Sequence, residues 1–400
     1  MISVAEARAR IVAAMRPTAP EMVGLAEAWG RVAAADHAAR LTQPPADVSA
    51  MDGFCLRAAD GALGARLSIV GSAPAGHPWP GTVGPGQAVR IFTGSVIPAG
   101  ADGILIVEDS AEEDEVLEVR EAVVAGRHIR RAGQDFALGD VLVAAGTRIG
   151  ARAVGLLAAG NHPWARVHRR PRVALLATGD EIALPGEPIP AGGIVSSNAH
   201  ALAALVRAGG GEPVVLPVAA DNEAALLAAV EGLSCDLLVT TGGASVGTHD
   251  LVQPVLAGRG LRTDFWKIAM RPGKPLMFGA LDGIPMLGLP GNPVSALVCA
   301  VLFLLPALSR LQGLPGEGPV ESEAVLGADL PANDHRADHL RARLEQGADG
   351  VPVATAFSRQ DSGMLRLLVE SDALILRAPH APPASAGERV RVIRLDAIGI

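Results

Sequence analysis

Residues 166–315 alternate short runs of aliphatic residues with amphipathic segments, and this pattern restricts the possible folds more than any other feature of the chain. The aliphatic runs have the length and composition of buried strands, while 198–207 and 221–233 have helical periodicity. Strands that alternate with helices form a parallel sheet covered on both faces. We therefore predict a doubly wound, mostly parallel α/β domain. Its four recognisable strands are residues 173–177, 213–216, 236–240 and 284–287.

Three of the predicted strands end in loops of unusual composition. The carboxyl ends of parallel strands meet at one edge of a sheet, where open α/β sheets bind ligands. These loops therefore favour one shared site. They are Thr178-Gly179-Asp180-Glu181, Thr241-Gly242-Gly243 and Gly288-Leu289-Pro290-Gly291-Asn292.

Two of these loops have features of anion-binding sites. Consecutive glycines at Gly242 and Gly243 allow backbone N–H groups to point at a phosphate, and Ser245 adds a hydroxyl donor. The loop matches neither common phosphate-loop fingerprint, so a tight turn is the alternative interpretation. Asn292 suits the N-cap of an apolar helix and Pro293 its first position, and the free N–H groups there form a second anion seat. Helix capping alone is a sufficient explanation of that pair.

Carboxylates follow the same strands. Asp180, Glu181, Asp221 and Asp250 supply hard oxygen ligands, and Mg²⁺ usually binds one or two carboxylates together with phosphate oxygens. Asp221 is equally suited to be a helix N-cap. We therefore predict Asp221 and Asp250 as magnesium ligands, with Asp250 the better candidate because it lies just beyond the glycine loop.

Lys267 and Lys274 are the only lysines in a chain with 34 Lys and Arg residues. A lysine ammonium is a compact charge on a flexible stem, which reaches an oxyanion without the planar fork of arginine. Pro272, Gly273 and Pro275 shape the backbone around Lys274, which a merely solvated charge would not need. We predict that this window binds an oxyanion.

The flanking regions predict further domains. Residues 46–140 are rich in glycine, proline and short β-like runs, and residues 320–400 alternate apolar and polar positions as in a small antiparallel barrel. The helix-like stretches near residues 20–45 and 141–165 link them. The predicted domains are a central α/β domain (1–18 and 166–319), a linking domain (19–45 and 141–165), a β-rich domain (46–140) and a C-terminal β-barrel (320–400).

Composition argues against several classes of protein. A net charge of −8 and 3% aromatic residues, with no tyrosine, argue against a nucleic-acid or anionic-membrane surface. The most apolar stretch of the sequence runs over residues 294–305, and a stretch of this length is too short to cross a bilayer. Cys55, Cys235 and Cys299 lack metal-ligand spacing and suggest buried thiols in a reducing compartment. Together with the absence of a signal-peptide pattern, this predicts a cytoplasmic protein.

The ordered set of motifs resembles the molybdopterin molybdenumtransferase family, the bacterial enzymes related to the E domain of gephyrin, along essentially the whole chain. The resemblance implies an elongated four-domain homodimer whose active sites combine the α/β domain of one subunit with the β-rich domain of the other. It also implies that adenylylated molybdopterin and molybdate react in a metal-dependent step that releases AMP. The motifs that carry it are Ser49-Ala50-Met51-Asp52-Gly53, Phe92-Thr93-Gly94, Ile97–Asp102, Ala177–Glu181, Thr241–Gly247, Pro272-Gly273-Lys274-Pro275 and Gly288–Ser295.

The resemblance and the residue chemistry together give a set of site residues. Phe54 departs from the family tyrosine, and Arg271 stands where some relatives carry lysine, so it keeps the charge and adds a bidentate fork. The predicted catalytic residues are Asp52, Thr93, Asp135, Glu181, Asp221, Asp250, Lys267 and Lys274. The predicted substrate-binding residues are Gly242, Gly243, Ser245, Arg271, Pro272, Gly273, Pro290, Gly291, Asn292, Ser295, Arg341 and Ser362.

Three alternative functions stay open at this level. The α/β core also resembles the molybdopterin adenylyltransferase domain, so ATP-dependent adenylylation is one alternative, and such an enzyme is also a candidate partner. A carrier or scaffold that binds molybdopterin without turnover is the second, although it has no evident use for the acidic residues. The third is a nucleotide pyrophosphatase that uses the same edge of the sheet.

Overall fold

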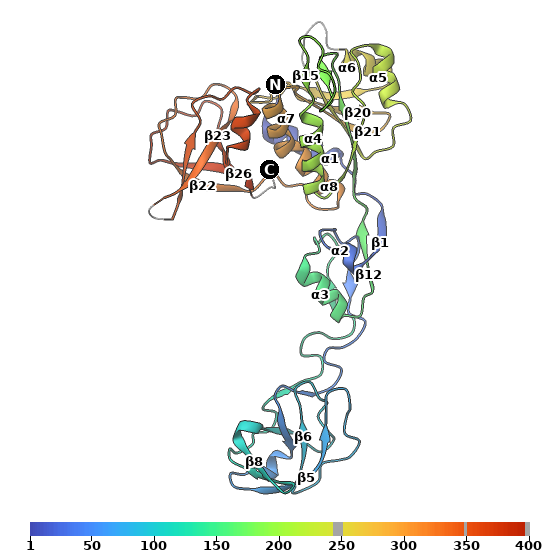
Figure 1. Ribbon diagram of the computed structural model, residues 1–400, viewed down its shortest axis with the longest axis vertical. Helices are drawn as coiled ribbons and strands as arrows, with labels where there is room; N and C mark the ends of the chain where they lie inside the picture. Colours follow the sequence, from blue (N-terminus) through green and yellow to red (C-terminus); the bar gives the residue numbers. More distant parts are fainter. Residues whose placement is uncertain (243–250, 348–349, 397–400) are drawn as a thin grey trace. The chain divides into compact units, whose positions relative to one another are not determined.

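The computed structural model describes residues 1–242, 251–347 and 350–396, and the chain divides into two compact units (Figure 1). The first unit comprises Met1–Glu21, Gly30–Ala34 and Val167–Ile400, and the second comprises Met22–Trp29 and Ala35–Arg166. The finer division into four domains stays a prediction.

A six-stranded mixed sheet forms the centre of the first unit, in the order β16-β13-β17-β21-β20-β18. The first four strands are parallel, which confirms the predicted doubly wound α/β domain, and β20 and β18 add an antiparallel edge. The strands are β13 (Arg172–Ala177), β16 (Glu212–Val215), β17 (Leu237–Thr241), β18 (Arg262–Trp266), β20 (Met277–Leu281) and β21 (Ile284–Leu289).

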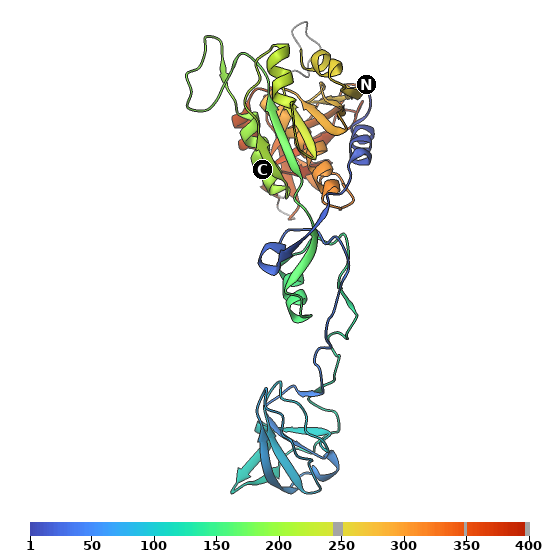
Figure 2. The same ribbon diagram turned by 90° about the vertical axis from the view of Figure 1, so that its right-hand side faces the viewer.

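Alternate residues of the parallel strands face two separate helical layers, as the two-residue period of a strand requires. Leu175 and Val239 pack in a core with α1, α4, α7 and α8, whereas Leu176 and Leu238 pack in a core with α5 and α6. Figure 2 shows helices on both sides of the sheet. The helices are α1 (Val4–Ala14), α4 (Asn198–Ala208), α5 (Glu223–Val230), α6 (Val252–Gly258), α7 (Pro293–Cys299) and α8 (Leu305–Leu311).

The apolar helix after Asn292 is longer than predicted. A π-helical segment, η3 (Ala300–Leu304), joins α7 to α8, so helical structure runs over 19 residues, Pro293–Leu311, and the length argument against a membrane span was wrong. Pro306 lies directly after the π-helical segment, where the regular i→i−4 hydrogen-bond pattern is already interrupted, so its missing N–H does not end the helix. Within the structure 78% of the apolar window is buried, as in a core helix.

A closed barrel of five strands follows the α/β domain, because β23 pairs with both β24 and β25. The barrel is not purely antiparallel as predicted, since β22 and β24 run parallel. A short strand from the central domain, β19 (Met270–Arg271), pairs in parallel with β23. The barrel elements are β22 (Glu321–Leu326), β23 (Ala337–Gln346), β24 (Pro352–Ala356), α9 (Leu365–Val369), β25 (Ala373–Arg377) and β26 (Arg389–Arg394).

The second unit contains a six-stranded sheet in the order β7-β4-β6-β5-β9-β8, which confirms the predicted β-rich region. Phe54 packs into a core on one side of this sheet and Cys55 into a core on the other. The sheet strands are β4 (Gly53–Leu56), β5 (Arg66–Ala73), β6 (Gln87–Ile91), β7 (Gly103–Ile106), β8 (Ser110–Glu113) and β9 (Val116–Val119).

Short elements complete the chain. Two small ribbons of the second unit pair β3 (Val48–Ser49) with β10 (Ile129–Arg130), and β2 (His37–Ala38) with β11 (Val141–Val143). The others are β1 (Pro20–Gly24), α2 (Leu25–Ala28), α3 (Ala151–Ala159), β12 (Trp164–His168), β14 (Ile182–Ala183) and β15 (Ile194–Val195).

Candidate active site

A pocket of about 610 Å³ opens at the carboxyl edge of the central sheet. In the sheet, β13 lies between β16 and β17. After β13 the chain crosses to β16 at one edge of the sheet, whereas after β17 it continues to the strands on the other side, β18, β20 and β21. Such a change of winding direction leaves a crevice between the two strand ends, where α/β proteins bind ligands. The loops after β13, β17 and β21 line it, as predicted. The predicted site residues among the lining are Glu181, Gly242, Pro290, Gly291 and Asn292.

The first wall depends on glycine at position 242. Gly242 has a φ of +87°, and a Cβ there would lie 2.7 Å from the carbonyl oxygen of Thr178. Any other residue would therefore push apart the loops that follow β13 and β17. Gly243, Ser245 and Asp250 lie outside the described residues.

The opposite wall is built from Asn292 and a loop of the barrel. Asn292 occupies the N-cap position of α7 with Pro293 next to it, as predicted, but its side chain does not cap the helix. Instead its Nδ2 donates to Ser362 Oγ at 2.9 Å, and the backbone N–H of Val294 donates to the Ser362 carbonyl at 3.1 Å. Gly363 also lines the pocket. Ser295, in contrast, is buried with 4% of its surface exposed.

Arg341 supports this loop from β23, on the face of that strand that is turned away from the barrel core and toward the α/β domain. Its side chain is 1% exposed, its Nε donates to Gln360 Oε1 at 3.3 Å, and its Nη1 donates to the Met364 carbonyl at 3.3 Å. These contacts hold both ends of the segment that carries Ser362. Among the described residues, Nη2 has no hydrogen-bond partner, and burial lowers the pKa of the guanidinium. Arg341 is not among the described residues that line the pocket.

Three carboxylates gather beside the pocket. The backbone N–H of Asp221 donates to Asp180 Oδ1 at 2.9 Å, and Glu181 lines the pocket itself. Burial, followed by repulsion from Asp180 and Glu181, raises the pKa of Asp221. The N-cap interpretation of Asp221 was wrong, because the side chain of Asn222 caps α5 by accepting from the Ala225 N–H at 2.9 Å.

The two lysines belong to one closed loop between β18 and β20. Its ends are joined by hydrogen bonds from Lys267 N–H to the Leu276 carbonyl and from Ile268 N–H to the Lys274 carbonyl, each 3.1 Å. Lys267 has a φ of +124°, which is rare for a residue with a side chain and is found mostly at functional sites. In the part of the chain that the structure describes, neither lysine side chain has a hydrogen bond or ion pair. Pro275, next to Lys274, lines the pocket.

The positions of the other predicted residues of this loop are explained by backbone conformation, core packing and ion pairs. Gly273 has a φ of +105°, and a Cβ there would collide with Cys299 Sγ in the core. Pro272, beside it, follows a cis peptide bond. The Arg271 guanidinium, which was expected to bind an oxyanion, pairs with Asp338 of the barrel and lies 3.8 Å from Asp334 Oδ2.

The second unit holds the remaining predicted residues. Asp52 Oδ1 accepts hydrogen bonds from the backbone N–H and the hydroxyl of Thr93, at 2.7 and 2.8 Å. These bonds lower the pKa of Asp52 and keep it ionised. Asp135 is exposed, and among the described residues its side chain has no hydrogen-bond partner.

Sequence reasoning missed the pocket wall that precedes α4. Ser196, Ser197 and Asn198 line the pocket, and Asn198 Nδ2 donates to the Gly291 carbonyl at 2.6 Å. The polar run before an apolar helix was the available signal, but it is equally typical of ordinary helix starts.

The cysteines do not supply a nucleophile. Cys55 and Cys299 are buried as predicted, whereas Cys235 is only partly buried. Burial raises the pKa of Cys55 to about 12 and that of Cys235 to about 11, and it also raises the pKa of Cys299. The reactive thiolate is therefore scarce at neutral pH.

Comparison with known proteins identifies the family. Three family models match in order: MoeA N-terminal region (domain I and II) at residues 2–160, Probable molybdopterin binding domain at 174–310, and MoeA C-terminal region (domain IV) at 323–395. The chain belongs to the MoeA family. The MoeA pocket described above lies in the region matched by the second of these models, with Gly363 contributed from the third.

Similar MoeA proteins match along their whole length. Molybdopterin molybdenumtransferase 2 of Mycobacterium tuberculosis is 34% identical, covering 98% of this chain and 99% of its own. Molybdopterin molybdenumtransferase of Haemophilus influenzae is 33% identical, covering 98% of each. Two crystal structures of the molybdopterin biosynthesis MoeA protein from Pyrococcus horikoshii have TM-scores of 0.85 and 0.83, at 29% and 27% identity, and each covers 98% of this chain.

Proposed function

We propose that this molybdopterin molybdenumtransferase of molybdenum cofactor biosynthesis inserts molybdenum from molybdate into adenylylated molybdopterin and releases AMP. The observation that carries the proposal is the position of the lysine loop. It brings Pro275 into a pocket at the switch point of a MoeA-type sheet, next to Lys274, whose ammonium has no carboxylate partner among the described residues.

The lysines suit the charge of the proposed substrates. Molybdate and a phosphoanhydride are both tetrahedral oxyanions, so Lys267 and Lys274 would offset ground-state charge and the charge that develops on the leaving AMP. The high thiol pKa values argue against a cysteine nucleophile, so an oxygen of molybdate or water is the proposed attacking group.

We propose Mg²⁺ as the metal, held by Asp221 and Asp250 together with substrate oxygens. The described residues contain no ready group of three or more protein ligands for a metal. The site nevertheless fits a cation that takes part of its coordination from phosphate. Burial, followed by repulsion from Asp180 and Glu181, raises the pKa of Asp221, and a positive charge would offset that repulsion. A bound Mg²⁺ would neutralise charge on the phosphate oxygens.

We also propose a cytoplasmic homodimer, in which the Asp52–Thr93 pair of one subunit completes the site of the other. Closed two-fold assemblies are the commonest oligomers, and the exposed Asp52 carboxylate, which Thr93 keeps ionised, offers a charged group to a partner subunit. A separate molybdopterin adenylyltransferase is the proposed source of the substrate.

A single-turnover reaction with adenylylated molybdopterin tests the function. AMP, measured by chromatography, should appear only with a divalent cation, and molybdate should promote its release. A carrier would bind the pterin and return it intact, and an adenylyltransferase would incorporate AMP from ATP. A pyrophosphatase would cleave ordinary dinucleotides without molybdate. Any of these three outcomes would reject the proposed function.

A further inference from the structure

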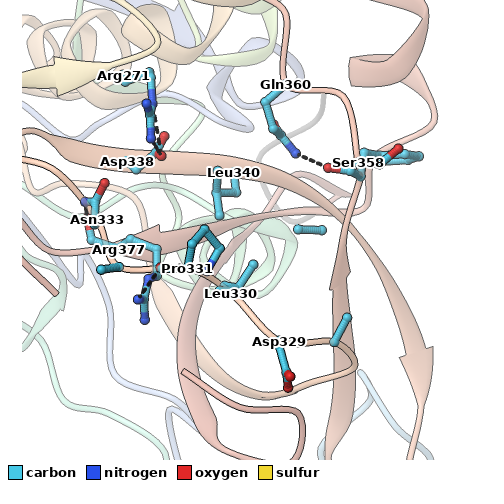
Figure 3. Close-up of a pocket in the computed structure, with 14 residues that line it drawn as sticks. Arg271, Asp329, Leu330, Pro331, Asn333, Asp338, Leu340, Ser358, Gln360 and Arg377 are labelled. Atoms are coloured by element: carbon cyan, nitrogen blue, oxygen red, sulfur yellow. Dashed lines mark hydrogen bonds and ion pairs between the residues drawn. The ribbon is translucent and has the colours of Figure 1, made fainter. Parts of the chain in front are cut away.

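The Arg271 guanidinium faces the barrel and is already paired with carboxylates there. Its Nε donates to Asp338 Oδ2 at 3.0 Å, and its Nη2 donates to the same oxygen. Figure 3 shows this pair at one end of a second cavity, of about 430 Å³, in the barrel. Arg271 lines that cavity and is not among the described residues that line the pocket of the central sheet.

Asp338 is the buried member of this ion pair. Its side chain is 6% exposed, while that of Arg271 is 48% exposed, so the carboxylate is the buried partner. A buried carboxylate that loses its cation is strongly disfavoured. The pairing therefore fixes Arg271 more firmly than the surface ion pairs of this protein fix their arginines.

The same residue anchors the lysine loop to the barrel through its backbone. Met270 and Arg271 form β19 opposite Ala337 and Asp338, and the Ala337 N–H donates to the Ala269 carbonyl at 2.9 Å. The backbone of Arg271 also lies beside the buried imidazole of His339. The middle of the loop is thus held by the barrel, while its two ends continue into β18 and β20 of the central sheet.

We infer that Arg271 is a positioning residue that, through Asp338, holds the lysine loop so that Lys274 stays beside Pro275, which lines the pocket, and that it does not itself bind the oxyanion. This inference rests on the proposed function of the pocket. Two nearby carboxylates offset the charge of Arg271, so its net attraction for a molybdate or phosphate group is small. The forked contact from Nε and Nη2 requires an arginine, because a lysine has a single nitrogen.

Asp338→Asn separates positioning from direct binding, because the two roles predict opposite effects. If Arg271 bound the oxyanion directly, removing its competing carboxylate would maintain or strengthen molybdate binding and turnover. If it positions the loop, Asp338→Asn should lower kcat by on the order of 10- to 100-fold, the range expected when a catalytic group is misplaced by about 1 Å. Arg271→Lys should lower kcat similarly.

A double-mutant cycle with Lys274→Ala tests whether the effect passes through the loop. The double variant Asp338→Asn/Lys274→Ala should be no slower than Lys274→Ala alone, because the group being positioned is already missing. Multiplied effects would overturn the inference. Glu370→Gln is the matched control: it removes another barrel carboxylate that pairs with two arginines, Arg343 and Arg366, and should leave kcat unchanged.

Hydrogen exchange gives a readout that does not depend on turnover. Asp338→Asn should speed exchange of the loop-closing amides of Lys267, Ile268 and Leu276, whereas Glu370→Gln should not. Unchanged exchange in Asp338→Asn would overturn the inference even with an active enzyme. If the wild type releases no AMP but the exchange result holds, the proposed function fails while the positioning of the loop stands.

Discussion

Substitution of Gly273 by alanine should destabilise the first unit by about 2–6 kcal/mol. The φ of +105° imposes strain of about 1–3 kcal/mol on a residue with a Cβ. The new methyl group would also collide with Cys299 Sγ, which is fully buried, and overpacking of this kind costs about 1–3 kcal/mol. Urea unfolding followed by circular dichroism measures the combined effect.

Gly283 provides the matched control for this substitution. It has a φ of +85° in the turn between β20 and β21, and a Cβ there would meet nothing within 4 Å. Gly283→Ala therefore carries backbone strain without the collision, and it should be less destabilising than Gly273→Ala by about 1–3 kcal/mol. Adding Cys299→Ala to Gly273→Ala should recover part of that difference. Equal destabilisation by the two glycine substitutions would refute the packing argument.

Three further predictions concern the charges and the assembly. Lys267→Ala and Lys274→Ala should each abolish or severely reduce AMP release with little change in Tm, because a charge without an ion pair among the described residues contributes little to stability; normal turnover in both would reject the lysine site. Mixing Asp52→Ala subunits with Lys274→Ala subunits should restore activity, and mixtures that exchange subunits but stay inactive would contradict the shared site. Burial lowers the pKa of His339 to about 4 from 6.5, so the unfolded chain binds the extra proton first. Stability should therefore fall as the pH drops from about 6.5 to about 4, and His339→Asn should flatten that part of the urea-midpoint profile, whereas an unchanged slope would assign it to other groups.

Local sequence signals were sufficient for the elements whose environment is uniform. The parallel strands are buried on both faces, so they read as continuous aliphatic runs, and the glycine at 242 marks the end of β17 because the backbone requires it there. The antiparallel edge was missed because β18 is mostly exposed and begins with Arg262 and Thr263, which interrupt the apolar pattern.

Contacts between distant segments were not accessible in the same way. The partner of Arg271 lies 67 residues away on a barrel strand, and nothing near either residue indicates the pairing. The sequence shows that Arg271 carries a positive charge, but only its contacts in the folded protein decide which group that charge binds. Asp221 shows the same limit on a smaller scale, because its neighbour Asn222 caps the helix and leaves the carboxylate beside Asp180.

The discontinuity of the first unit sets an order for its folding during synthesis. Ala7 and Ile11 of α1, and Met15 directly after it, are fully buried in the core of that unit, but their partners on the central sheet begin only after Val167. At ribosomal rates of about 5–20 residues per second, the helix emerges roughly 10–30 s before those partners. The second unit is continuous over Ala35–Arg166 and can fold within this interval, while the apolar face of α1 waits for its sheet. A nascent chain of this protein therefore exposes an N-terminal hydrophobic segment that chaperones can bind.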